Sequence, residues 1–319
     1  MPHVTFIHGI GNKPEKEALL DAWVGDLADN GLDLETRGVS TSMVCWADVM
    51  YPEPAAAELG HESAEAMVDE GVEDVDMSWL DDADESERRL VGGLATAILL
   101  QTPPVEEPEE IPESTREEVT ATGYERIPLP ENVKRPLMKA LLRDVHHYLF
   151  DTEHEPRPGV VYHVQHEIRH RFLSELQAAA GSSRPHVVVS HSMGTVIAYD
   201  CLKRVGDCPP VDGLLTIGSP LGFDEITDRL RPEWTADGGF PSERVGGGWT
   251  NVYDPFDIVA AFHPRLAGNY RRDGSKVLKD VMVWNNGTWR HGISNYFARP
   301  KLRDALAELL WPDRGGSRR

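Results

Sequence analysis

Short runs of large apolar residues alternate along the chain with longer segments in which apolar residues recur at helical spacing. The apolar runs predict buried strands at 2–8, 42–46, 186–190, 213–217, 250–253 and 279–284. The helical spacing predicts helices at 14–30, 135–150, 160–180, 194–205 and 299–311. Strands that alternate with helices predict an α/β fold, in which helices cover both faces of a mostly parallel sheet.

The segment 52–134 interrupts this alternation with alanine and glutamate runs, an apolar stretch at 90–100 and a Pro/Glu-rich stretch at 102–113. It holds 23 of the 53 acidic residues and 5 of the 32 basic ones, whereas the remaining chain carries 30 acidic and 27 basic residues. We interpret it as an acidic inserted cap or lid on a core formed by 1–51 and 135–319. This charge balance argues against nucleic acid as a partner.

The cysteines and the apolar runs exclude several other classes of protein. Cys45, Cys201 and Cys208 have no CxxC spacing, so neither a disulfide framework nor a four-cysteine zinc site is expected. The longest apolar run has about eleven residues, which is short of the roughly 20 needed to span a bilayer, so no transmembrane segment is predicted. Since the first strand begins near residue 3, a signal peptide is not expected, and a cytoplasmic location is predicted.

The segment 187–200 is the most informative for chemistry, because a buried strand leads directly into a helix with Ser192 at the turn. Such a turn lifts a hydroxyl clear of the sheet and needs small residues two positions to either side, which Ser190 and Gly194 provide. The segment resembles the Gly-x-Ser-x-Gly nucleophile elbow of α/β-hydrolases, with serine at the first glycine position. The resemblance implies the α/β-hydrolase fold and identifies Ser192 as the nucleophile.

A second segment, His8-Gly9-Ile10-Gly11, follows the first strand and is similar to the His-Gly oxyanion loop of lipases. In that family, the amide after His-Gly and the amide after the serine hold the developing oxyanion. The resemblance therefore implies the backbone N–H groups of Ile10 and Met193 as the oxyanion hole. A glycine-containing turn without catalytic function is the alternative interpretation.

The acid and the base of a triad should follow the serine in that order. Asp254 and Asp257 both fall in range, but Asp254 precedes a proline and suits a turn. Asp257 begins an Asp-Ile-Val segment that resembles the acid segment of several lipases and is the preferred acid, with Asp254 as the alternative. His291 lies in a loop after the last strand and is the predicted base, whereas His263 follows Asp257 too closely.

The Gly218-Ser-Pro-Leu221 segment, together with the elbow, is similar to DDHD-type intracellular phospholipases and related bacterial esterases. The similarity covers 2–11 and 187–296 but not the acidic segment. It implies a cofactor-independent serine hydrolase that cleaves a carboxylic ester, of a small molecule or a lipid, through an acyl-enzyme. A phospholipid substrate is only suggested, and Ser219 is then a residue of the pocket wall.

A competing motif lies at 166–170, where His166-Glu-Ile-Arg-His170 matches the His-Glu-x-x-His pattern of zinc peptidases. No third ligand stands at a known spacing, so no metal is expected, although a zinc-dependent hydrolase stays open as an alternative. A non-catalytic binding protein on the same fold is a further alternative.

Overall fold

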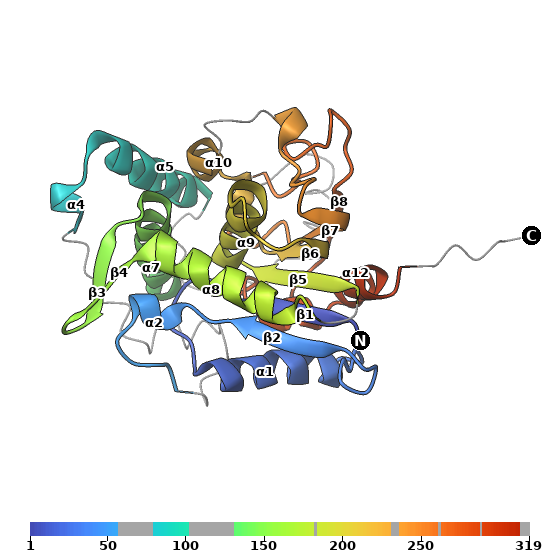
Figure 1. The fold of residues 1–319 in the computed structure, drawn as a ribbon. Helices are drawn as coiled ribbons and strands as arrows, with labels where there is room; N and C mark the ends of the chain where they lie inside the picture. The colour runs from blue at the N-terminus through green and yellow to red at the C-terminus, as the bar shows by residue number, and fades with distance from the viewer. Residues whose placement is uncertain are drawn as a thin grey trace, which may run out of the picture.

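The computed structural model describes residues 1–56, 79–101, 131–181, 184–230, 236–260, 263–287 and 289–312. Its centre is a six-stranded parallel sheet with the order β2-β1-β5-β6-β7-β8 (Figure 1). The strands are β1 (His3–Ile7), β2 (Ser40–Val44), β5 (His186–His191), β6 (Val211–Ile217), β7 (Val245–Tyr253) and β8 (Lys279–Met282). The predicted α/β class with a parallel sheet is confirmed.

Helices cover both faces of this sheet. On one face, α1 (Lys16–Asp29), α11 (Ile293–Phe297) and α12 (Pro300–Leu310) pack against alternate strand residues such as Val187 and Val189. On the other face, α8 (Val164–Ala179) and α9 (Met193–Arg204) belong to the cluster that contains Val188. Burial on both faces explains why β5 is an uninterrupted apolar run, since each face of the strand removes its own side chains from water.

The remaining elements are smaller or lie outside the sheet. They are the helices α2 (Ala47–Met50), α4 (Trp79–Asp82), α5 (Glu85–Gln101), α7 (Glu131–Phe150) and α10 (Asp224–Leu230), and the 3-10 turns η2 (Pro220–Gly222) and η3 (Ala236–Gly238). Figure 1 shows α4, α5 and α7 grouped on one side of the molecule. Of the segment 52–134, positions 57–78 and 102–130 lie outside the described residues. No helix in the described part of the chain is long and apolar enough to cross a membrane.

The predicted helix at 160–180 is wrong in its first four residues. Val160–His163 form β4, which pairs antiparallel with β3 (Glu153–Arg157) in a two-stranded sheet that the sequence analysis missed. The reason is local turn chemistry, because Pro158 and Gly159, the latter with φ +78°, reverse the chain just before β-branched residues that favour a strand.

Candidate active site

Ser192 occupies a sharp turn between β5 and α9. Its backbone has φ +53° and ψ −128°, a strained conformation for a residue with a side chain, and its N–H donates to the carbonyl of Ile217 at 3.0 Å. A Cβ atom on Gly194 would lie 2.6 Å from the carbonyl oxygen of His8 and 2.7 Å from that of Ile7. Position 194 therefore has no room for a side chain, which agrees with the small residue expected there.

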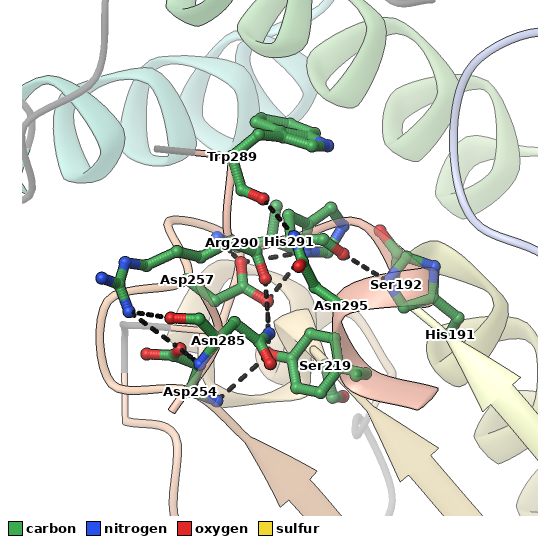
Figure 2. Close-up of polar contacts among 12 residues, drawn as sticks. His191, Ser192, Ser219, Asp254, Asp257, Asn285, Trp289, Arg290, His291 and Asn295 are labelled. Atoms are coloured by element: carbon green, nitrogen blue, oxygen red, sulfur yellow. Dashed lines mark hydrogen bonds and ion pairs between the residues drawn. The ribbon is translucent and has the colours of Figure 1, made fainter. Parts of the chain in front are cut away.

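The side chains of His291 and Asp257 are hydrogen-bonded, although 34 positions separate them in the chain. The Nδ1 atom of His291 is 2.9 Å from both carboxylate oxygens of Asp257 (Figure 2). Burial alone would raise the pKa of Asp257, but His291, the Tyr296 hydroxyl and the Val259 amide together lower it. Asp257 is therefore an ionised acceptor that holds a proton on Nδ1, and a neutral His291 ring then has its lone pair on Nε2.

Ser192 and His291 belong to segments that contact each other directly. The His191 ring, next to Ser192 in the chain, donates from Nε2 to the carbonyl of His291 at 2.9 Å, and the two rings lie 4.6 Å apart between centroids. Ser192 is 0% exposed and His291 3% exposed, and neither the Ser192 Oγ nor the His291 Nε2 has a hydrogen-bond partner in the described structure. A buried hydroxyl and a buried ring nitrogen are thus both left available for chemistry.

Asp254, the alternative acid, bonds groups other than the His291 ring in the described structure. Its carboxylate accepts bonds from the amides of Phe256 (2.8 Å) and Asn285 (2.5 Å) and from the Arg290 guanidinium at 3.3 Å. Burial raises its pKa to about 6, against the effect of these hydrogen bonds. The bond to Phe256 is the predicted turn contact, and the other two anchor the loop that leads to His291.

The loop 8–13 lies against Ser192 and is held by its own histidine. A Cβ on Gly9 would meet the Cβ of Ser192 at 2.5 Å and its Oγ at 3.0 Å, so the loop backbone approaches the serine closely. The Trp46 amide donates to Nε2 of His8 at 3.0 Å, and Nδ1 of His8 lies 2.8 Å from the carbonyl oxygen of Gly9. Because an amide can only donate, Nε2 is the acceptor and Nδ1 carries the proton.

This tautomer fixes the direction of the Ile10 amide. The Gly9–Ile10 peptide is trans, so the Ile10 N–H points away from the carbonyl that His8 holds. Met193 is the first residue of α9, and its amide is one of those that a helix leaves without an internal partner. Both backbone donors expected from the sequence therefore lie on segments that adjoin Ser192.

Two charged residues that the sequence analysis did not single out support the same loop. The buried Lys13 ammonium donates to the carbonyls of Ile10 (2.5 Å), Gly11 (3.3 Å) and Asn12 (3.2 Å). The Gly11 amide donates to the buried carboxylate of Asp144 on α7 at 3.2 Å. Asp144 lies 133 positions from Gly11, so no local pattern in the sequence points to it. For Lys13, the nearby glycine turn was a weak signal.

Removing the His8 imidazole should therefore weaken the support of the Ile10 amide. For the hydrolase that the sequence predicts, we expect His8→Ala to lower kcat roughly tenfold, less than the 100- to 1,000-fold typical when a donor is lost outright. His3→Ala is the matched control, because it removes a buried histidine from the other end of β1, where the ring bonds Ser40 and Ser42 and packs against His186. Equal losses in both variants would show that His8 acts through stability alone.

Ser219 lies beside the elbow helix and not at a second nucleophilic turn. Its Oγ accepts a bond from the Leu221 amide and lies 2.7 Å from Oγ1 of Thr195 on α9, which in turn donates to the carbonyl of Ser192. The preceding Gly218, with φ +54°, is a feature that the sequence analysis missed. A Cβ at this position would lie 2.8 Å from Oδ2 of Asp257 and 3.2 Å from Nδ1 of His291.

The His-Glu-x-x-His motif lies on α8 with both imidazoles exposed. Glu167 pairs with Arg171 at 2.8 Å, and Arg169 forms an ion pair with the buried Asp200 on α9 at 2.7 Å. Among the residues that the structure describes, no group of three or more His, Cys, Asp or Glu side chains is arranged to hold a metal. The opposite face of α8, with Ile168 and Phe172, is buried in the core.

The apolar stretch of the acidic segment contributes to the buried core. Leu90, Val91 and Leu94 of α5 belong to the buried cluster that also contains Met193 and Trp289. Ser192 is fully buried in this arrangement, and its Oγ atom is inaccessible.

No protein-family model and no curated protein matches the chain. Among solved structures, one from Pectobacterium atrosepticum, described as a candidate YdeN-like hydrolase, is similar with 12% identity and a TM-score of 0.28 over 69% of this chain and 96% of that one. An uncharacterized protein from Pseudomonas aeruginosa is similar with 12% identity and a TM-score of 0.30, over 97% of this chain and 45% of that one. Likenesses this distant identify neither a family nor an activity.

Proposed function

We propose that the protein is a serine hydrolase that cleaves carboxylic esters through a Ser192–His291–Asp257 triad. The observation that carries the proposal is the pairing of His291 Nδ1 with an ionised carboxylate, close to a strained serine, while Nε2 and the Ser192 Oγ stay unbonded. The unbonded Nε2 can accept a proton, and the unbonded Ser192 hydroxyl can give one. A base held in this tautomer is what a serine needs to become a nucleophile.

In the proposed mechanism, His291 Nε2 takes the Ser192 proton while Oγ attacks the ester carbonyl carbon. The carbonyl oxygen becomes an oxyanion that the amides of Ile10 and Met193 stabilise. The imidazolium gives its proton to the departing alcohol, and the C–O bond of the ester breaks to leave an acyl-enzyme. Water then attacks the acyl group, with His291 again as base, and releases the acid and the free serine.

An ester with an apolar acyl group is the substrate class that we favour. The buried cluster that contains Met193, the residue after the serine, is rich in aliphatic and aromatic side chains and also includes Trp289 and the α5 residues Leu90 and Leu94. We propose that 52–134 is a cap on the core 1–51 and 135–319, since its described helix α5 belongs to this cluster. The acidic character of the segment disfavours attraction to anionic membranes.

Fluorophosphonate labelling followed by peptide mapping tests the proposal. We expect the wild type to carry one label, on Ser192, and Ser192→Ala to carry none and to hydrolyse no ester in a panel of graded acyl length. Ser219→Ala is the matched control, because Ser219 is also a buried serine near the elbow, but its hydroxyl is bonded to Thr195. Full labelling of Ser192→Ala, or activity lost to a chelator but not to Ser192→Ala, would refute the triad.

A further inference from the structure

The hydroxyl of Tyr296 bonds the carboxylate that orients His291. Tyr296 lies on α11, fully buried, and its hydroxyl oxygen is 2.6 Å from Oδ2 of Asp257 and 3.1 Å from the amide nitrogen of Asp254. The amide can only donate, so it occupies a lone pair of the hydroxyl. The single hydroxyl proton is therefore directed to Asp257.

The acceptor positions of Asp257 are then divided among three donors. The Val259 amide donates to Oδ1 at 2.9 Å, Tyr296 donates to Oδ2, and His291 Nδ1 lies 2.9 Å from both oxygens. The Val259 amide on Oδ1 and the Tyr296 hydroxyl on Oδ2 fix the orientation of the carboxylate, and His291 Nδ1 lies within hydrogen-bond distance of both oxygens. The carboxylate cannot rotate without breaking one of these bonds.

Other ionisable groups around the pair are already engaged elsewhere. Arg290 bonds the carboxylate of Asp254 and not that of Asp257, and His191 donates to the main chain of His291. Burial raises the pKa of Tyr296 well above its usual range, so the phenol stays protonated and remains a donor at any working pH. Tyr296 is thus the side chain, besides His291 itself, that donates to Asp257 in the described structure.

We propose that Tyr296 is a positioning residue that sets the orientation and the basicity of Asp257, and through Asp257 the strength of His291 as a base. This inference rests on the proposed function. A phenol that donates to Oδ2 withdraws charge from the carboxylate. Without that donor, Asp257 stabilises the imidazolium more strongly, and His291 stays protonated to a higher pH.

Tyr296→Phe tests this proposal through a pH profile. We expect the acid limb of kcat/KM to move upward by about 0.5 to 1 pH unit, with kcat roughly tenfold lower and KM little changed. Tyr148→Phe is the matched control, since Tyr148 is also fully buried and donates to a buried carboxylate, that of Asp200, at 2.7 Å. Its profile should keep the midpoint of the wild type.

Incorporation of 3-fluorotyrosine at position 296 gives a second variant that preserves the shape of the side chain. Its more acidic phenol donates more strongly, so the acid limb should move to lower pH, opposite in sign to Tyr296→Phe. Proton NMR of the far-downfield His291 Nδ1–H signal gives a readout that does not require turnover, and the two variants should displace this signal in opposite directions.

The results separate this proposal from the proposed function. The role of Tyr296 would be overturned if both Tyr296 variants kept the wild-type acid limb of kcat/KM and the wild-type Nδ1–H signal. It would also be overturned if Tyr148→Phe moved the acid limb as far as Tyr296→Phe does. Ester hydrolysis that survives in Ser192→Ala would instead overturn the triad, while the NMR signal would still report whether Tyr296 controls the Asp257–His291 pair.

Discussion

Asp257→Asn should lower kcat by about four orders of magnitude with little change in stability, whereas Asp254→Asn should lower it by no more than about tenfold. The carboxamide of asparagine can donate to His291 Nδ1, which favours the tautomer with the proton on Nε2. That tautomer cannot accept the Ser192 proton, so the base is lost although the geometry survives.

The chemistry of Asp254 explains why the same substitution should be mild there. Its pKa of about 6 means that the wild-type protein already populates the neutral acid near that pH, and asparagine resembles this neutral form. The amides of Phe256 and Asn285 donate to different carboxylate oxygens, so the single oxygen of asparagine keeps only one of these bonds. The His291 loop still keeps the two bonds between Asn285 and Arg290, which do not involve Asp254.

Steady-state kinetics with a short-chain ester measures both effects, and thermal unfolding checks that both variants are folded. Comparable losses in the two variants would mean that the aspartates act as one structural unit and that His291 has no dedicated orienting acid. A larger loss for Asp254→Asn would make Asp254 the functional acid.

The elements next to the elbow were predictable because their signals are local. An apolar strand, a small-residue turn and an amphipathic helix follow one another within 187–205, and β5 and α9 lie where this pattern places them. The chain order of Asp257 and His291 was likewise readable, and the structure brings these two side chains within hydrogen-bond distance. A short apolar segment after a Pro-Gly turn fits either a strand or the start of a helix, and β4 was wrongly predicted as helix.

The residues that orient the site were not predictable, because their roles arise only from long-range contacts. Tyr296 looks like an ordinary residue of an apolar helix until folding sets its hydroxyl between Asp254 and Asp257. Asp144, on α7, bonds the loop 8–13 from 133 positions away. A single sequence contains the periodicity of each element, but the register in which distant side chains meet depends on the packing of the whole sheet.

Gly218→Ala should lower kcat/KM by at least about 100-fold, because the added methyl group has no space beside the Asp257–His291 pair. It would lie 2.8 Å from Oδ2 of Asp257 and 3.2 Å from Nδ1 of His291, so one of these side chains must move. Asp257 cannot move freely, since it is held by Val259 and Tyr296. The imidazole is displaced from the carboxylate, and Nε2 moves away from the serine.

The same substitution also strains the backbone, because alanine at a positive φ costs about 1–2 kcal/mol of stability. Gly38→Ala separates the two effects: Gly38 has φ +70° and nothing within 4 Å of an added Cβ, so this variant carries the strain without the collision. Gly38→Ala should be destabilised in chemical denaturation and keep wild-type turnover of the remaining folded protein. If Gly218→Ala loses stability but not kcat/KM, the close approach of Gly218 to the acid and the base has no part in the chemistry, and Asp257 and His291 tolerate more movement than a triad permits.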